Sequence, residues 1–273
     1  MRRGVIAAIG CLFFLAMAAG AIAAPRAELW PRWQAHGEAN ALRVDHRGWD
    51  LFLRRFVVTD DPSGINRLRY CQVTDVDRQR LESYLQRLQQ VFVSTLNLQE
   101  QKAYWINLYN ALTVKVILDH YPVAGIRDID ISGFFKDGPW DRKLVTVEGI
   151  DISLNDIEHR ILRPIWGDNR VHYALNCASR GCPNLQPRAY TVDNMEQLLE
   201  QGARDYVNHS RGVALEGDIL YLSSIYDWYG DDFGGDRQQL FAHLSSYAEG
   251  ELAATLAGFT GTVKYRYDWA LNE

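Results

Sequence analysis

The segment 99–119 constrains the fold most, because its middle is apolar on almost every side. A helix of that composition lies inside a protein rather than on its surface. Asn107 and Asn110 stand three residues apart and therefore share one face of this helix. A buried amide without hydrogen bonds costs about 1–3 kcal/mol, so both amides must have partners. Either they bind the backbone of a neighbouring segment, or Asn107 donates to an oxyanion and Asn110 helps to bind a ligand.

Hydrophobic patterns elsewhere in the chain predict further helices and short strands. The helices are expected around Trp49 to Phe56, over 77–93, from Ser153 to Ile165, over 192–208 and over 237–248. Hairpins are expected at the two-residue links Glu148-Gly149 and Gly217-Asp218, followed by a closing aromatic strand over 263–269. Alternating apolar residues at Val171, Tyr173 and Leu175 predict a half-buried strand before an irregular loop.

These elements predict the α+β class. The chain shows no linker, internal repeat or low-complexity block, so we expect a single globular domain over 45–273 after an N-terminal lead, 24–44. In this domain the central helix is expected to pack on a small, mostly antiparallel sheet.

A carboxylate stands on the apolar stripe of the helix that begins at Ser153. Glu158 lies within the same arc as Ile157 and Ile161, whereas Asp156, His159, Arg160 and Arg163 are expected to face away. A buried carboxylate must find a cation or a donor, or stay protonated. Glu158 is therefore expected either in an internal ion pair or as a functional carboxylate near His172.

The N-terminus has the order of a cleavable export signal. Arg2 and Arg3 precede an apolar run from Val5 to Ala19, and small residues follow up to Ala23. The run is shorter than the roughly 20 apolar residues that a membrane span needs. We therefore predict a signal peptide over 1–23 and an exported protein, periplasmic or secreted, without a stable membrane span after cleavage.

Charge narrows the class of partner. Loss of Arg2 and Arg3 takes the formal net charge from −5 to −7. An acidic chain of this kind is a poor general partner for nucleic acid. We expect a small-molecule or peptide substrate, or an envelope protein partner, and neither a cofactor nor a metal.

The stretch 171–185 gathers the most chemistry in the chain. His172, Cys177 and Cys182 occur within it, at the end of the predicted strand and in the loop that follows. A thiol enzyme needs a thiolate, a base and a group that orients the base. Cys177 and His172 could supply the first two, with Glu158, Asp227, Asp232 or Asn107 as the third. The two residues would point to opposite faces of a straight strand, so only a turn after Leu175 could bring them together.

Two other interpretations of this stretch stay open. The spacing His-x4-Cys-x4-Cys lacks the tight ligand pairs of zinc knuckles and needs a distant fourth ligand, so a metal site is less favoured. A Cys177–Cys182 disulfide that closes a small loop is the structural alternative, because an exported protein meets oxidising conditions. An odd number of mature cysteines, Cys71 being the third, leaves at least one free thiol.

Five motifs in order resemble the domain-of-unknown-function-547 family over about residues 45–272. They are Trp105-Ile106-Asn107-Leu108-Tyr109-Asn110-Ala111, Asp156-Ile157-Glu158-His159, the stretch from His172 through Cys182-Pro183 to Leu185, Trp228 with Asp232-Phe233, and Tyr267-Asp268-Trp269.

The resemblance implies a layout similar to papain-like and transglutaminase-like enzymes. Those enzymes carry the nucleophilic cysteine at the start of the central helix, ahead of the histidine. Here Asn107 lies on that helix and the cysteines follow His172. The departure leaves a permuted order, a different nucleophile in Cys177, or a scaffold that binds without catalysis. Plant members resemble adaptor proteins with coiled coils, which supports the last of these.

The leading hypothesis is a cysteine-dependent hydrolase or acyl transferase acting on an amide or thioester. Its expected catalytic groups are Cys177 as nucleophile, His172 as base, Glu158 or Asp232 as orienter, and Asn107 or Asn176 as oxyanion donor. The residues expected to bind are Asn110, Asn176, Ser179 and Trp228. The alternative is a non-catalytic envelope module that binds a protein and carries a structural Cys177–Cys182 disulfide.

Overall fold

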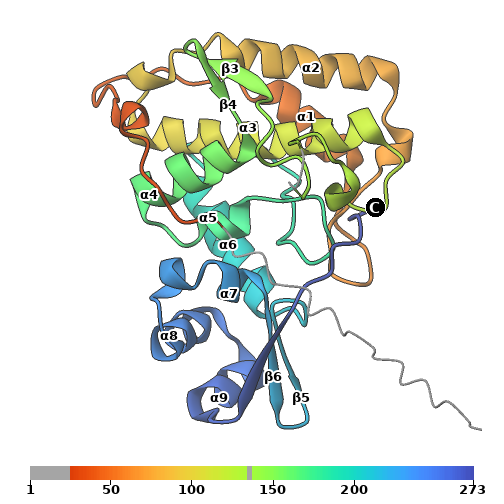
Figure 1. Ribbon diagram of the computed structural model, residues 1–273, viewed down its shortest axis with the longest axis vertical. Coiled ribbons are helices and arrows are strands. Elements are labelled where there is room, and N and C mark those ends of the chain that lie inside the picture. Colours follow the sequence, from red (N-terminus) through yellow and green to blue (C-terminus); the bar gives the residue numbers. More distant parts are fainter. Residues whose placement is uncertain (1–24, 134–136) are drawn as a thin grey trace, which may run out of the picture.

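The computed structural model describes residues 25–133 and 137–273 as one domain of helices and small sheets (Figure 1). The α+β class is therefore confirmed. The predicted signal segment 1–23 lies outside the described residues. In Figure 1 the helices from the first half of the chain lie above, and α8, α9 and the sheet of β5 and β6 lie below.

The helices and strands follow in chain order. The longer helices are α1 (Arg47–Phe56), α2 (Asp75–Gln89), α3 (Leu98–His120), α6 (Met195–Val207), α8 (Arg237–Tyr247) and α9 (Gly250–Gly258). The short helical segments used below are the π-helix η5 (Asp156–Leu162), α4 (Arg163–Trp166), α5 (Val171–Ala174), α7 (Ile225–Trp228) and the 3-10 turn η6 (Gly230–Phe233). The strands are β1 (Val57–Val58), β2 (Arg67–Leu68), β3 (Val145–Val147), β4 (Ile150–Ile152), β5 (Val213–Glu216), β6 (Ile219–Ser223) and β7 (Thr262–Arg266).

Helix α3 is the centre of the larger hydrophobic core, as its composition predicts. Its side chains from Glu100 to Val114 are all buried, and Asn97 caps its first turn by accepting the N–H of Glu100 at 3.0 Å. No helix within residues 25–133 and 137–273 has the length and apolar character that crossing a membrane requires. Side chains of α3 pack in the larger hydrophobic core.

The packing partner of α3 differs from the expectation. Its chief neighbours are α2 and η5, and not a sheet. β1 with β2 and β3 with β4 form two-stranded antiparallel hairpins, whereas β7 joins the β5–β6 hairpin in parallel. That three-stranded sheet packs in a second core with α6 and α8. The hydrophobic pattern of a strand predicts an extended segment but does not show which helix packs on it. This explains why the expected packing of α3 on a sheet differs from the observed packing.

The predicted strand at Val171–Leu175 is wrong, because Val171–Ala174 form the helical turn α5. The turn begins where Asp168 Oδ1 accepts the N–H of Arg170 at 3.0 Å. All four side chains of α5 are buried. Alternation of apolar and polar residues distinguishes a strand from a helix only when one face is exposed to solvent. All four side chains here are buried, so the apolar pattern could not distinguish the two structures.

The outward orientation expected for Asp156, His159 and Arg163 is also wrong, because all three are buried. They lie in or beside η5, whose π-helical turn is wider than the α-helical spacing that the prediction assumed. The N-terminal segment covers this face as well. Glu28 donates its N–H to the His159 carbonyl at 2.9 Å, and Trp30 donates to Arg160 at 3.0 Å.

The C-terminal segment binds the loop that carries the two cysteines. The N–H groups of Arg180 and Gly181 donate to the carbonyls of Ala270 and Asp268, both at 2.8 Å. Asn272 returns a bond from its N–H to the Ala178 carbonyl at 3.0 Å. A Cβ at Gly181 would lie 2.8 Å from Asp268 N and 2.9 Å from its carbonyl oxygen. Glycine therefore allows the two backbones to approach this closely.

Gly181→Ala should destabilise the protein by about 1–3 kcal/mol, because the added methyl group forces the two segments apart. Gly258→Ala is the matched control, since a Cβ there meets nothing within 4 Å. Urea unfolding of both variants measures the effect. Equal stability of the two variants would contradict the close packing at Gly181.

Candidate functional site

Cys177 lies in the loop after α5 and is surrounded by hydrogen-bonding groups. Its Sγ lies 3.0 Å from Cys182 Sγ, 3.1 Å from the Tyr267 hydroxyl and 3.2 Å from Ser179 Oγ. Both cysteines are free thiols. Cys177 is half-buried and Cys182 is buried, so the first residue is the more exposed of the two.

These contacts give the two thiols different acidities. Burial alone raises the pKa of Cys177, but the hydrogen bonds from Cys182, Ser179 and Tyr267 outweigh it and hold that pKa below its ordinary value. Burial, followed by the contact with Cys177, raises the pKa of Cys182 well above the ordinary value. The pair therefore favours a Cys177 thiolate that accepts a hydrogen bond from a Cys182 thiol.

The backbone next to Cys177 is strained. Ala178 has a φ of +60°, a conformation that residues other than glycine rarely adopt. Asn176 holds it there, because its Oδ1 accepts the N–H of Ala178 at 2.9 Å and its Nδ2 donates to the Pro183 carbonyl at 2.7 Å. Strain of this kind collects at functional sites, where surrounding contacts fix it.

The two amides of α3 bind loop backbone. Asn110 donates to the Ala174 carbonyl at 2.9 Å and accepts the N–H of Asn176 at 2.9 Å. Asn107 does the same for Tyr190, with distances of 2.7 Å and 3.0 Å. The central helix thus fixes both ends of the segment that contains Cys177. Both amide atoms of Asn107 bond to the backbone of Tyr190, whereas the Cys177 sulfur contacts Cys182, Ser179 and Tyr267.

His172 is held by an acidic partner distant in sequence. Its Nε2 lies 2.7 Å from Asp232 Oδ2, and Arg163 donates to the same oxygen at 2.5 Å. Burial alone raises the pKa of Asp232, but the bonds from His172 and Arg163 hold it well below its usual range. The structure therefore brings together His172 and one of its two predicted orienters.

The other nitrogen of His172 points towards the second predicted orienter. Glu158 Oε1 lies 3.8 Å from Nδ1, which is beyond a hydrogen bond, and Nδ1 is buried without a partner among the described residues. Each ring nitrogen thus faces a carboxylate. Among the described residues, neither nitrogen is hydrogen-bonded to Cys177.

Two tyrosines interact electrostatically both with the Cys177 thiol and with the acid cluster, which consists of His172, Asp232, Arg163 and Glu158. The Tyr229 ring stacks on His172 with centroids 4.2 Å apart. Burial raises the pKa of the Tyr229 phenol, and the charges of Glu158 and Cys177 both raise it further. Tyr109 on α3 responds in the same way to burial and to the same two groups. Glu158 and Cys177 therefore lie within electrostatic range of the same two phenols.

A cluster of half-buried aromatic rings lies beside the thiol. The Tyr267 ring lies 4.9 Å from Trp228 and 4.6 Å from Trp269, and Trp228 stacks on Trp269 at 5.5 Å. Trp228, a predicted binding residue, is thus linked to Cys177 through Tyr267.

Sequence reasoning missed the roles of Arg163, Tyr229 and Tyr267. Tyr267 stands in the closing Tyr-Asp-Trp motif, and Tyr229 follows Trp228, so both were visible as motif neighbours. The α-helical spacing predicts that Arg163 lies on an exposed face. Only the π-helical geometry of η5 would place it in the interior. Among the described residues, no group of three or more His, Cys, Asp or Glu side chains could hold a metal ion.

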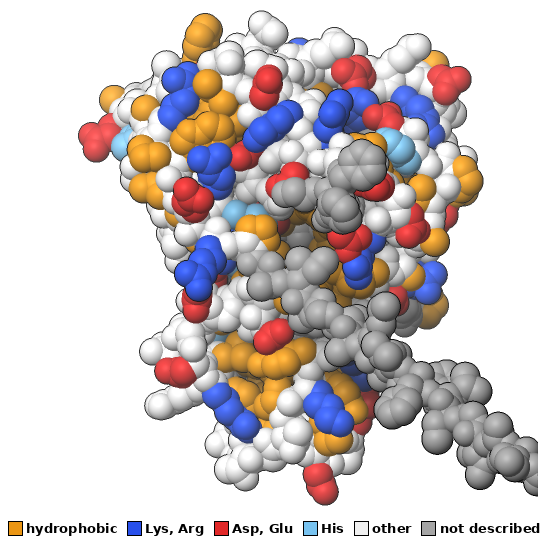
Figure 2. Space-filling view, viewed as in Figure 1, with side chains coloured by type: hydrophobic (Ala, Val, Ile, Leu, Met, Phe, Trp, Pro, Cys, Tyr) orange, Lys and Arg blue, Asp and Glu red, His pale blue; other side chains and the backbone are white. Residues whose placement is uncertain are grey.

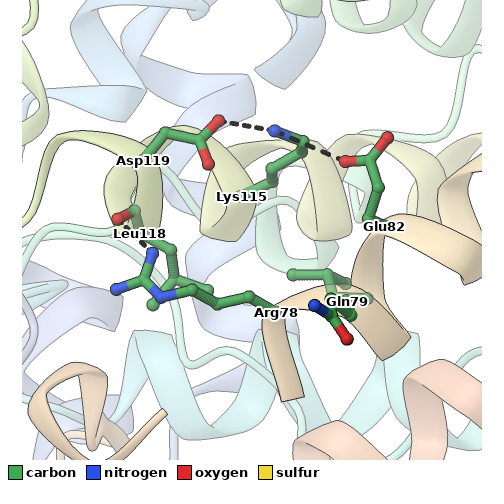
Figure 3. A pocket seen from close by; sticks show the side chains of 7 residues that line it. Arg78, Gln79, Glu82, Lys115, Leu118 and Asp119 are labelled. Carbon is green, nitrogen blue, oxygen red and sulfur yellow. Dashed lines mark hydrogen bonds and ion pairs between the residues drawn. The ribbon is translucent and has the colours of Figure 1, made fainter. Parts of the chain in front are cut away.

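Two surface depressions lie apart from these groups. The one shown in Figure 3, of about 190 Å³, lies between α2 and α3, and its Lys115 pairs with Glu82 and Asp119. The other, of about 130 Å³, lies between β7 and α8. Figure 2 shows hydrophobic side chains gathered over this lower part of the molecule. None of the residues that contact Cys177 lines either depression.

Comparison with family models finds a match over residues 93–207 to the family described as "Protein of unknown function, DUF547". The match covers 115 of the 273 residues. It includes α3, η5, α5, the Cys177 loop and α6, whereas Asp232 and Tyr267 lie beyond the matched residues. No curated protein and no solved structure matched the chain. The papain-like or transglutaminase-like layout therefore stays a prediction.

The buried histidine of η5 should make stability depend on pH. Burial lowers the pKa of His159 to about 4, below the roughly 6.5 of an unfolded histidine. Between these values the unfolded chain binds a proton that the folded chain does not, so stability falls as the pH falls.

Replacement His159→Gln should lower the slope of unfolding free energy against pH by up to about 1 kcal/mol per pH unit between pH 6.5 and 4. The exposed His36 supplies the control variant, His36→Gln. Urea unfolding at several pH values gives the slopes. The same slope in both variants would show that His159 is not buried as a neutral ring.

Proposed function

We propose that this protein is a cysteine-dependent acyl transferase or hydrolase with Cys177 as its nucleophile. The observation that carries the proposal is a half-buried cysteine with three hydrogen-bonding side chains around its sulfur, on a strained turn. Hydrogen bonds to an anion stabilise it, so the sulfur is available as the nucleophilic thiolate. The family match over 93–207 includes this turn but assigns no activity.

The environment of Cys177 favours a thioester over an amide as substrate. An amide needs an acid to protonate its leaving amine, a task that imidazolium performs in cysteine proteases. Both nitrogens of His172 face carboxylates instead. A thioester releases a thiolate, which leaves without prior protonation, so it makes the smaller demand on this site.

The reaction would take place in two balanced steps. The Cys177 thiolate attacks the thioester carbonyl, the bond from carbon to the leaving sulfur breaks, and an acyl-Cys177 intermediate and a free thiolate result. Water or an acceptor nucleophile then attacks the intermediate, loses a proton to solvent and releases Cys177 as thiolate. Tyr267 and Ser179 would donate hydrogen bonds to the sulfur when it regains its charge.

The acid cluster would act through Tyr229 rather than on the sulfur. Asp232 and Arg163 fix His172, and His172 stacks on Tyr229, so these groups are positioning residues in this scheme. Glu158 would set the electrostatics of the two phenols near Cys177. Asn176 would maintain the turn, and Asn107 would anchor Tyr190 instead of serving an oxyanion.

The chain would work outside the cytoplasm after loss of residues 1–23. The support is the basic start, the apolar run and the small residues before Ala24. The substrate would then be a small-molecule or peptide thioester of the cell envelope.

A non-catalytic binding module is the second candidate. The half-buried rings of Trp228, Tyr267 and Trp269 favour it, because aromatic side chains with one exposed face are frequent at binding surfaces. An envelope protein would be the partner. This candidate requires no thiolate at Cys177.

An acyl adduct on Cys177 is the direct test of the proposed function. Incubation with S-phenyl thioacetate should add one acetyl group to Cys177, detected by mass spectrometry after acid quench. Cys177→Ser should reduce thiophenol release by at least about 100-fold, the lower range for loss of a catalytic group. Cys71→Ser, which removes an exposed thiol, should leave it unchanged. Acetylation of Cys71 alone would contradict the proposal.

Removal of one hydrogen bond to the Cys177 sulfur should raise the pKa of its thiol. Tyr267→Phe is expected to raise the pKa of Cys177 by about one, since a hydrogen bond to a charged group is worth about 1.5–3 kcal/mol. The control is Tyr265→Phe, on β7 and exposed. The rate of iodoacetamide alkylation against pH, in a Cys71→Ser background, gives both values. The same midpoint in the two variants would show that Tyr267 does not stabilise the thiolate.

A further inference from the structure

We propose that Cys177 and Cys182 form a redox-active dithiol that exchanges electrons with disulfides. The proposal rests on their geometry: two free thiols whose sulfurs lie 3.0 Å apart across a loop of four intervening residues. It shares Cys177 with the proposed function but does not depend on acyl transfer. A disulfide at this pair would remove the nucleophile that acyl transfer requires.

The two sulfurs are placed for different tasks. Cys177 is half-buried, whereas Cys182 is buried. The N–H of Cys177 donates to Cys182 Sγ at 2.9 Å and fixes the inner sulfur next to the outer one. Thiol–disulfide exchange requires one sulfur that attacks the external disulfide and a second, more protected sulfur that attacks the resulting adduct.

The loop is closed before any disulfide forms. Asn176 joins Ala178 to Pro183 through its two amide atoms, and the C-terminal segment binds Arg180 and Gly181. Oxidation would therefore change little beyond the S–S contact itself. A disulfide needed for folding would instead constrain a loop that is otherwise free.

The exchange has two balanced steps. The Cys177 thiolate attacks a disulfide RSSR, a Cys177–SR bond forms, and RS⁻ leaves. Cys182 then loses its proton to the medium, attacks Cys177 Sγ and expels the second RS⁻. Two electrons pass from the protein to the external disulfide, which is reduced to two thiols while the pair becomes a disulfide.

The test uses oxidised and reduced glutathione as the probe and the chain from residue 24 carrying Cys71→Ser, in which Cys177 and Cys182 are the remaining cysteines. Mass spectrometry after rapid alkylation should find an internal disulfide that forms with oxidised glutathione and disappears with excess reduced glutathione, without denaturant. Adding Cys182→Ser should stop the reaction at one glutathionyl group on Cys177. Adding Cys177→Ser should leave Cys182 unmodified, because the inner sulfur is buried.

Three results would overturn the proposal. They are a glutathionyl adduct that persists on Cys177 while Cys182 is present, a disulfide that resists reduction until the protein unfolds, and a large drop in melting temperature when the disulfide is reduced. Cys182→Ala and melting curves of each variant separate loss of exchange from loss of fold. Acetyl transfer to Cys177 in the Cys182→Ser protein is measured independently, so exchange can fail while the proposed function stands, and the reverse.

Discussion

The hydrogen bonds of three asparagine residues support the arrangement around Cys177. Asn110 on α3 binds Ala174 and Asn176, and Asn176 in turn binds Ala178 and Pro183. Asn272 completes the set by donating its backbone N–H to Ala178. Each bond satisfies a buried backbone group that would otherwise cost free energy. The strained turn at Ala178 can persist because these contacts over-determine it.

Two sets of polar side chains belong to this candidate site. The first set is Cys177 with Cys182, Ser179 and Tyr267, where hydrogen bonds lower the pKa of the Cys177 thiol although burial opposes this. The second set is His172 with Asp232 and Arg163. Tyr229 stacks on His172, and the Cys177 charge contributes to raising the pKa of its phenol. A thiolate stabilised by hydroxyl and thiol donors differs from one that is paired with an imidazolium, and under the proposed function this difference would favour substrates with good leaving groups.

The sequence predicts the parts of this structure that depend on local pattern. The apolar run of α3 and the Glu148-Gly149 hairpin were predicted correctly because composition and turn chemistry are local. Of the two carboxylates predicted to orient His172, Asp232 lies at hydrogen-bond distance from its ring. The strand at Val171 failed because full burial removes the difference between helix and strand patterns, and the η5 face failed because a π-helix breaks the α-helical period. Contacts such as Cys177 with Tyr267 join residues far apart in the chain, and no spacing rule shows them.

Cys177 ionises at a lower pH than an ordinary thiol because its neighbours stabilise the charge. The most direct measurement is the ultraviolet absorbance of the thiolate against pH, taken as the difference between the Cys71→Ser protein and the same protein with Cys177→Ser added. The account predicts that this absorbance appears at a pH below the ordinary thiol value of about 8.5. Absorbance that appears only at or above that value would contradict it.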